Sequence, residues 1–227
     1  MSDIRTNTLI IGCGIAGATA ALRLSDDPNQ HVTIITRSPD AIDSNTGWSQ
    51  GGIVTRGLGD TAGLLVGDIL HAGAGLSAPE AARILAEEGP RLVDDILIER
   101  CGVRFDRGED HELVYGLEAA HSTRRIVHVG DKTGCSAIIT QLLAALAKRP
   151  NVTLLTNHTA VDLITFPHHS LDPLDVYAPL TCHGATSSTA SAGKSCACWQ
   201  RRRSWRPAAW GKSTATPATP KARAATA

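Results

Sequence analysis

Three glycines near the start of the chain have the spacing of a phosphate-binding loop. Gly12, Gly14 and Gly17 form the pattern G-x-G-x-x-G between an apolar run at 7–12 and an Ala- and Leu-rich segment at 14–25. The first glycine of such a loop permits a tight turn, the second lets the backbone approach a pyrophosphate, and the third lets helix and strand pack closely. The pattern predicts a dinucleotide site, and the residues that we expect to form it are Gly12, Cys13, Gly14, Ile15, Ala16 and Gly17.

The segments around this loop predict the unit that positions it. The run at 7–12 is typical of a buried strand, 14–25 of a helix, and the β-branched run at 31–36 of a second strand. Together they make a βαβ unit, and the N-terminus of its helix attracts phosphate. The second strand ends at Thr36 and Arg37, where a NAD site usually carries an acidic residue for a ribose hydroxyl. We therefore expect Thr36 and Arg37 to hold the adenosine end, and a plain NAD site is disfavoured.

A second loop, SNTGWSQGGI at 44–53, is rich in small residues. It resembles a segment of the flavoprotein family that contains succinate dehydrogenases, fumarate reductases and L-aspartate oxidases. In that family the loop wraps the isoalloxazine ring and ribityl chain of FAD, and small residues let backbone N–H groups approach the flavin and stabilise its reduced form. The resemblance implies FAD contacts from Asn45, Thr46, Gly47, Trp48, Ser49, Gln50, Gly51 and Gly52.

The same loop also bears on how the flavin is attached. Membrane-bound members of the family carry a histidine here that bonds covalently to the flavin. The nearest position in this chain is Asn45, between Ser44 and Thr46. The resemblance therefore implies non-covalent FAD and favours the L-aspartate oxidase branch.

Two further blocks carry the resemblance, DILHAGAGL at 68–76 and LEAAHSTRRIVHVGDKTG at 117–134. The positions of the second block that match the L-aspartate oxidase pattern are Glu118, His121, Ser122, Arg125, Ile126, His128, Asp131, Thr133 and Gly134. In those oxidases the glutamate faces the substrate and reads its α-amino group, which implies this catalytic-site role for Glu118. Ala119 and Ala120 replace the usual glycine pair.

The charged residues of this block have a second interpretation. His121, Arg124, Arg125 and His128 could form a structural ion network around Asp131. We favour the structural role for Arg125 and His128, and the functional role for Glu118.

The resemblance continues at NHTAVDLI (157–164), which is similar to the strand whose backbone clamps the adenine, and implies contacts from Thr159 and Ala160. The implied activity is oxidation of L-aspartate to iminoaspartate in quinolinate and NAD synthesis. The α-hydrogen leaves as hydride to the flavin, and oxygen or fumarate reoxidises it. Two alternatives stay open: a soluble flavoprotein of the fumarate reductase or succinate dehydrogenase type, and a fragment that binds FAD weakly or not at all.

Composition narrows the partners and the cellular location that we expect. The formal net charge is zero, which gives no general attraction to nucleic acid or acidic membranes. No apolar run reaches the roughly 20 residues of a membrane helix, and no basic-then-apolar leader precedes residue 8. The six cysteines show no paired spacing. We expect a cytoplasmic protein that binds a small-molecule substrate, without nucleic-acid, membrane or metal partners.

These features predict an α/β fold: an incomplete Rossmann-type FAD-binding domain over residues 1–184, with a mostly parallel sheet. Helical spacing predicts helices at 61–75, 79–100 and 133–150, and 151–165 is typical of one or two strands. From 185 to 227 Ile, Leu and Val are absent, and we expect a disordered tail, because such a segment cannot bury apolar surface.

The tail has a specific oddity. Synonymous codons allow residues 185–227 to be re-read one base over, which gives V-L-A-A-G-G, Y-T-S-N-P and G-D-G in the order of the family's own continuation. The sequence therefore predicts a frameshift near codons 183–185 and a chain without the substrate-capping domain. A natural low-complexity tail is the alternative.

Overall fold

The computed structural model describes residues 4–189, 195–200 and 206–207, with the side chains of 131–133, 195–200 and 206–207 left aside. The chain divides into two compact units. The first combines residues 1–44 with 146–227, and the second comprises residues 45–145.

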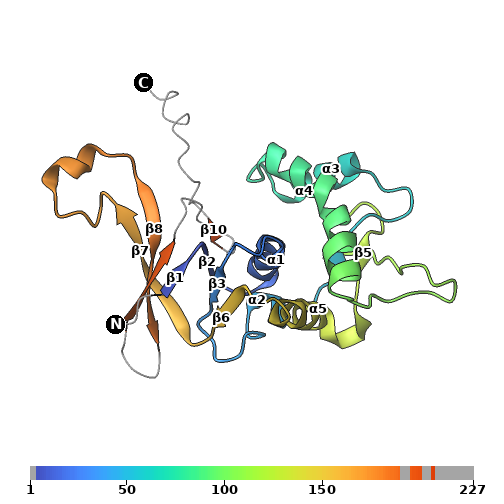
Figure 1. Ribbon diagram of the computed structural model, residues 1–227. Helices are drawn as coiled ribbons and strands as arrows, with labels where there is room; N and C mark the ends of the chain where they lie inside the picture. Colours follow the sequence, from blue (N-terminus) through green and yellow to red (C-terminus); the bar gives the residue numbers. More distant parts are fainter. Residues whose placement is uncertain (1–3, 190–194, 201–205, 208–227) are drawn as a thin grey trace. The chain divides into compact units, whose positions relative to one another are not determined.

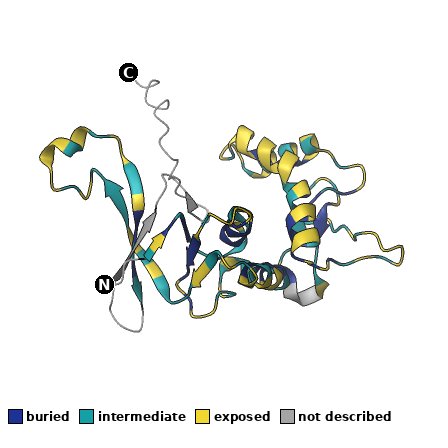
Figure 2. Ribbon diagram, in the orientation of Figure 1, coloured by how far each residue is buried: buried dark blue, intermediate teal, exposed yellow. Residues whose placement is uncertain are grey.

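The first unit contains the predicted βαβ fold. Its parallel sheet has the strand order β10-β2-β3-β6, and the bounds are Arg206–Pro207 (β10), Thr8–Ile11 (β2), Val32–Ile35 (β3) and Val152–Leu155 (β6). Helix α1 (Ile15–Leu24) connects β2 to β3, as expected (Figure 1). Leu9, Ile10 and Ile34 are fully buried, and Figure 2 shows β2 and β3 as the buried centre of this sheet. The mostly parallel sheet predicted for the domain is confirmed here.

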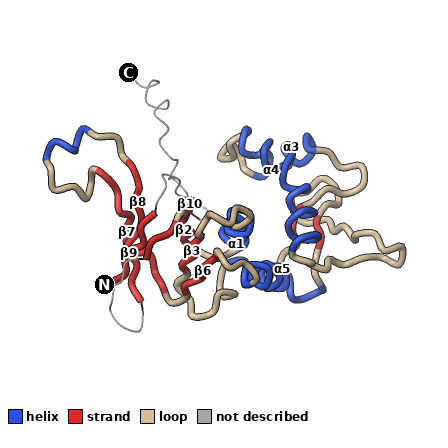
Figure 3. Tube along the Cα trace, viewed as in Figure 1, coloured by secondary structure: helices blue, strands red, loops and turns tan. Residues whose placement is uncertain are grey.

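A second sheet in the same unit has the order β1-β9-β8-β7, with bounds Ile4–Thr6 (β1), Ser195–Gln200 (β9), Thr181–Thr189 (β8) and His158–Phe166 (β7). Its β7–β8 and β8–β9 pairs are antiparallel, and β1–β9 is parallel. A short 3-10 helix, Pro173–Tyr177, lies in the β7–β8 connection (Figure 3). The sequence did not predict β1, which is only three residues long.

Strand β8 crosses the boundary that we expected at residue 184. Residues 185–189 continue the strand, and 195–200 and 206–207 lie in strands where composition predicted none. Ala185 and Ser187 are fully buried, and Ala185 packs against Leu9 and Ile35. A strand whose inward positions face an existing core can use small residues, so the absence of Ile, Leu and Val was a poor guide. Residues 190–194, 201–205 and 208–227 of the expected tail lie outside the described residues.

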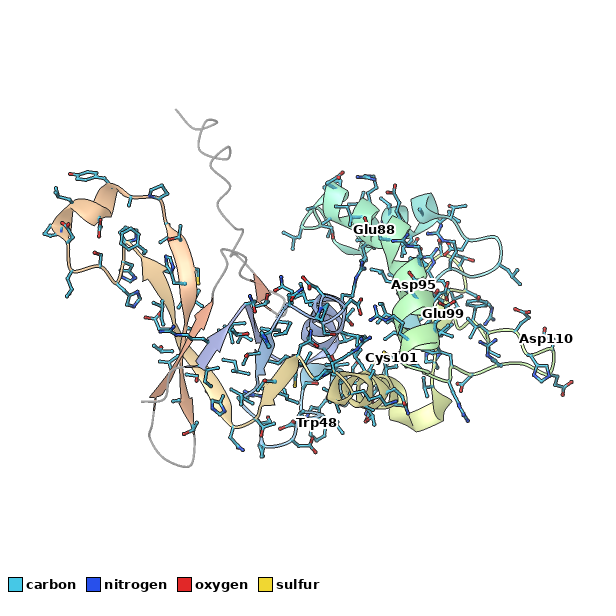
Figure 4. The ribbon with its side chains drawn as sticks, in the orientation of Figure 1. Trp48, Glu88, Asp95, Glu99, Cys101 and Asp110 are labelled. Carbon is cyan, nitrogen blue, oxygen red and sulfur yellow. The ribbon has the colours of Figure 1, made fainter. Side chains whose placement is uncertain are left out.

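The second unit is mainly helical around a two-stranded antiparallel ladder. The elements are α2 (Asn45–Trp48), β4 (Ile53–Val54), α3 (Ala62–Ala72), α4 (Pro79–Leu92), a π-helix (Val93–Arg100), β5 (Ile126–Val127) and most of α5 (Gly130–Ala147). The expected helix at 79–100 is therefore an α-helix that continues as a π-helix, and Pro90, which has no N–H to donate, lies inside its last α-helical turn. Its acidic side chains Glu88, Asp95 and Glu99, labelled in Figure 4, lie on its exposed face.

Candidate flavin and substrate site

The glycine loop forms the turn between β2 and α1. Gly12 has φ +95°, a conformation that favours glycine, and its N–H donates to the Ile35 carbonyl at 2.8 Å. Gly14 is the N-cap of α1 in an extended conformation, and Gly17 is buried in the first turn. The three glycines therefore occupy a strand–turn–helix, the setting in which this pattern binds a pyrophosphate. Ile15 and Ala16 begin α1, so their backbone lies in the turn that phosphate would face.

Cys13, within this loop, has a structural environment. The thiol is buried and donates to the Ala41 carbonyl, with Sγ and O 3.0 Å apart. Burial raises the pKa of the Cys13 thiol, because the thiolate loses its hydration. Any contact of Cys13 with a cofactor would therefore come from its backbone.

The residues expected at the adenosine end lie on neighbouring segments. Thr36 follows β3 and is buried, and Arg37 beside it is exposed. The His158 N–H donates to the Thr36 carbonyl at 2.9 Å, which brings the start of β7 beside this strand end. Ala160 packs its side chain against the core around Leu9, so β7 can offer only backbone at this position. The structure thus brings Arg37, Thr159 and Ala160 into one region.

The predicted flavin loop is more ordered than the sequence suggested. Residues 45–48 form one helical turn, α2, where a loop was expected, and Trp48 is 76% exposed (Figure 4). The composition of this segment predicted a loop because Asn, Thr and Gly are poor helix formers. A single helical turn that its neighbours hold in place can form despite low helix propensity. Ser49 and Gln50 follow and are exposed.

Two glycines fix the second half of this loop against its neighbours. A Cβ at Gly52 would lie 2.5 Å from Ile126 Cγ2 and from the Val127 carbonyl oxygen, so only glycine fits against β5. Gly134 has φ +41°, and a Cβ there would lie 2.9 Å from the Ser49 carbonyl oxygen. The thiol of Cys135 donates to the Gly51 carbonyl, with Sγ and O 3.4 Å apart. The 117–134 block and the residue after it therefore hold the loop from two sides.

Glu118 and His128 lie together beside this loop. Nε2 of His128 is 2.5 Å from Oε1 of Glu118, and the two side chains are 32% and 43% exposed. Oε2 of Glu118 is 3.9 Å from the position of a Cβ on Gly51. The structure thus places the carboxylate of Glu118 beside Gly51 of this loop. His128, which we expected in an ion network around Asp131, contacts Glu118 instead, and the side chain of Asp131 lies outside the described residues.

Arg125 is part of a buried ion cluster. Its guanidinium donates to both carboxylate oxygens of Asp60 at 2.8 and 2.9 Å, and to Asp68 at 2.5 Å. Arg125 is fully buried, which confirms a structural role, but the partners are Asp60 and Asp68. His121 contacts the same guanidinium through Nδ1 at 3.0 Å. The sequence did not predict these two partners. Asp68 precedes Arg125 by 57 residues and Asp60 precedes it by 65, and no local pattern links residues so far apart.

Ser122 completes this cluster. Its N–H and hydroxyl both donate to Asp68 Oδ2 at 2.9 Å. The backbone N–H of Ser122, helped by Arg125, lowers the pKa of Asp68 to about 2. The cluster therefore fixes the segment that carries Glu118 onto helix α3.

A family model described as "FAD binding domain" matches residues 7–203. The chain belongs to this FAD binding domain family. Its cofactor is FAD, and the glycine turn at the N-terminus of α1 fits that cofactor, because such a strand–turn–helix leaves backbone N–H groups free for a pyrophosphate. The match continues past residue 184, where we expected the family sequence to end.

The curated relatives of this FAD-binding chain are enzymes. An L-aspartate oxidase of Agrobacterium fabrum is 38% identical over 183 residues, which cover 80% of this chain and 33% of that protein. An L-aspartate oxidase of Clostridium acetobutylicum is 39% identical over 163 residues, or 72% of this chain and 36% of that protein. By family the chain is thus part of an FAD-dependent enzyme, and it spans about a third of the length of these relatives.

Solved structures support the fold of the FAD binding domain. The quinol fumarate reductase of E. coli has a TM-score of 0.78 at 16% identity, covering 91% of this chain and 33% of that one. The Sdh1 complex of Mycobacterium smegmatis has a TM-score of 0.74 at 21% identity, with 91% and 34% covered. At these identities the likeness concerns the fold.

No helix in the described part is both long and apolar enough to span a membrane. Within the same residues, no group of three or more His, Cys, Asp and Glu side chains could hold a metal ion.

Proposed function

We propose that the chain is the cofactor-binding part of an FAD-dependent L-aspartate oxidase, which converts L-aspartate to iminoaspartate. The observation that carries this proposal is the carboxylate of Glu118 beside Gly51, in a chain whose curated relatives are named L-aspartate oxidases. When bound, FAD supplies the hydride acceptor for the α-hydrogen of the substrate.

The glycine turn of the first unit and residues 45–52 of the second would each make their own contacts to FAD. Gly12, Gly14 and Gly17 would bind the pyrophosphate through backbone N–H groups, and Arg37, Thr159 and Ala160 the adenosine end. Residues Asn45 to Gly52 would face the flavin. Because Asn45 and its neighbours offer no histidine for a covalent link, we propose that FAD is held non-covalently.

Glu118 would select the substrate by charge. A carboxylate attracts an α-ammonium and hydrogen-bonds to it strongly. With 43% of its side chain exposed, Glu118 is accessible to a small molecule. Succinate has the carbon skeleton of aspartate without the ammonium, and it would gain nothing from this carboxylate. The attraction between the Glu118 carboxylate and an α-ammonium therefore favours an amino-acid substrate over its deaminated counterpart.

The proposal also covers the reoxidation of the flavin and the use of the product. Oxygen or fumarate would reoxidise the flavin, and iminoaspartate would feed quinolinate and NAD synthesis in the cytoplasm. The name L-aspartate oxidase, which the curated relatives carry, supports the production of iminoaspartate.

The cofactor part of the proposal is tested on the purified 227-residue chain mixed with FAD and freed of excess by gel filtration. We expect the visible absorbance bands of a bound oxidised flavin, and complete release of FAD into the supernatant on acid precipitation. Flavin that stays in the pellet would contradict non-covalent binding. A colourless protein would favour the alternative of a fragment that does not bind FAD.

The substrate part is tested on the protein encoded after the reading frame is restored by one base. We expect anaerobic L-aspartate to bleach the flavin, and succinate to leave it oxidised. Bleaching by succinate alone would instead support the second candidate, a succinate dehydrogenase-type flavoprotein. In the 227-residue chain we expect bound FAD without turnover.

A further inference from the structure

His128 has a confined imidazole ring. The residue follows β5, and its carbonyl accepts the Asp106 N–H at 2.9 Å, which fixes its backbone. A Cβ at Gly52 would lie 2.8 Å from Nε2, and a Cβ at Gly116 would lie 3.0 Å from Cε1. The ring therefore packs closely against Gly52 and Gly116, and it has little freedom to rotate away from Glu118.

Glu118, in contrast, is carried by a turn. Its carbonyl accepts the His121 N–H at 3.0 Å, and the next residue, Ala119, has φ +34°. A glutamate on an exposed turn has several rotamers of similar energy, and holding one of them costs side-chain entropy. The 2.5 Å contact with His128 Nε2 selects one arrangement of the carboxylate.

The two carboxylate oxygens then have different surroundings. Oε1 is occupied by the imidazole of His128, and Oε2 lies on the side of Gly51 in the flavin loop. If Nε2 carries the proton of a neutral ring, His128 donates one hydrogen bond and leaves the negative charge of Glu118 uncompensated. Oε2 is then a charged acceptor directed at the flavin loop.

We propose that His128 is a positioning residue: by donating from Nε2 to Oε1, it holds Glu118 so that Oε2 receives the α-ammonium of an amino-acid substrate. This inference rests on the proposed function for the identity of the substrate. The hydrogen bond itself and the tautomer that it requires are independent of that function.

The hydrogen bond is tested by the ring ¹⁵N spectrum of the full 227-residue chain loaded with FAD, with His128→Gln used to assign the signals of residue 128. We expect His128 to be the neutral Nε2–H tautomer. We expect Glu118→Ala to shift its signals and Glu118→Gln, which keeps an acceptor oxygen, to retain the tautomer. An Nδ1–H ring, or signals that Glu118→Ala leaves unchanged, would overturn the inference.

The consequence for the substrate is tested by titrating the same FAD-loaded chain with L-aspartate and with succinate, followed by flavin difference spectra. His128→Phe keeps a ring and removes the donor, and we expect it to weaken L-aspartate binding about tenfold or more, as for loss of a hydrogen bond to a charged group. Succinate binding should stay within about twofold, since succinate has no ammonium for the charged Oε2 to attract. His128→Gln should recover most of the loss, and His71→Phe, at an exposed histidine of the same unit, serves as the matched control.

These measurements distinguish failure of the positioning role of His128 from failure of the proposed L-aspartate oxidase function. Equal weakening of both ligands by His128→Phe, or no weakening at all, would show that His128 does not position Glu118. An unmodified chain that retains no FAD, or that does not prefer L-aspartate to succinate, would contradict the proposed function. In that case the ring spectrum still decides whether His128 donates to Glu118.

Discussion

The guanidinium of Arg56 donates a hydrogen bond of 2.6 Å to the carbonyl oxygen of Ala86. In an α-helix this carbonyl would accept the N–H four residues later, but that residue is Pro90, which has none. Arg56 thus supplies the donor that the proline cannot. Its side chain connects the segment after β4 to the point where α4 approaches the π-helix.

Removing this donor should destabilise the second unit. We expect Arg56→Ala to lower the free energy of unfolding by about 1–3 kcal/mol, the cost of leaving a buried acceptor unpaired. In a Pro90→Ala background, where the helix regains its N–H, the same change should cost clearly less. A double-mutant cycle by urea unfolding measures this coupling, and additive effects of the two changes would contradict the assignment.

The buried cluster around Arg125 predicts a larger effect. Arg125→Ala leaves the carboxylates of Asp60 and Asp68 without their cation, and removal of one partner of a buried pair costs about 3–5 kcal/mol. Denaturant unfolding should show this loss, and the neighbouring Arg124→Ala, at an exposed position, should change stability by less than about 0.5 kcal/mol. Similar losses in both variants would show that the ion cluster is not the cause.

The depressed pKa of Asp68 predicts how stability depends on pH. Its folded-state value of about 2 is below the ordinary value of 3.8, so the unfolded chain binds this proton first as pH falls. The stabilisation is complete above about pH 4 and is lost as pH falls from there towards 2. Unfolding measured across this range should show a smaller acid-induced loss in Asp68→Asn than in the unmodified chain. An identical pH profile for both would contradict a lowered pKa.

The flavin loop predicts that glycine is required at position 52. A Cβ in Gly52→Ala would meet Ile126 and Val127 at 2.5 Å, and the loop must shift to relieve the clash. We expect the FAD affinity of the chain to fall about tenfold or more, measured by quenching of flavin fluorescence, because a small displacement removes several backbone contacts. Gly67→Ala is the matched control, since a Cβ there meets nothing within 4 Å. Equal FAD binding by both variants would show that Gly52 does not shape the site.

The proposed frameshift predicts a specific feature of the DNA. We expect the gene to read, one base over from codon 185, through triplets that encode V-L-A-A-G-G, Y-T-S-N-P and G-D-G. Sequencing of the genomic segment and of its transcript tests this directly. Third-base choices that place other residues or stop codons in the shifted frame would leave the tail as a natural low-complexity segment.

The parts of the fold that the sequence predicted are those formed by neighbours along the chain. β2, α1 and β3 follow from apolar runs separated by glycine and polar breaks, because each segment contacts the next. Pairings over long distances could not be predicted in this way. Arg125 finds Asp60 and Asp68 only after α3 and β5 are in place, and β9 joins β1 across almost the whole chain.

The site shows the same division. The resemblance singled out residues 44–53 and Glu118 as candidate site residues, because these residues stand in contiguous blocks. It did not reveal that His128 contacts Glu118, since the family pattern gives residue types without their partners. The charged residues of the 117–134 block predicted an ion network. The structure was needed to show that Arg125 pairs with Asp60 and Asp68, and that His128 contacts Glu118.

The register of β8 carries a consequence for how a sheet tolerates altered sequence. Its pairing with β7 runs from His158–Thr189 to Phe166–Thr181, with a register shift beside residue 184, where Ile164 pairs with Gly184 and Thr165 with Cys182. The pairs on both sides of this shift use main-chain donors and acceptors that nearly every amino acid possesses. Such a strand can form from the sequence translated in either reading frame, provided that the side chains are small or common in β-strands. Ala185 and Ser187 meet that condition at the two fully buried positions. Errors in translation or in a gene can thus be absorbed at a strand more readily than at a glycine turn, where a single Cβ is excluded.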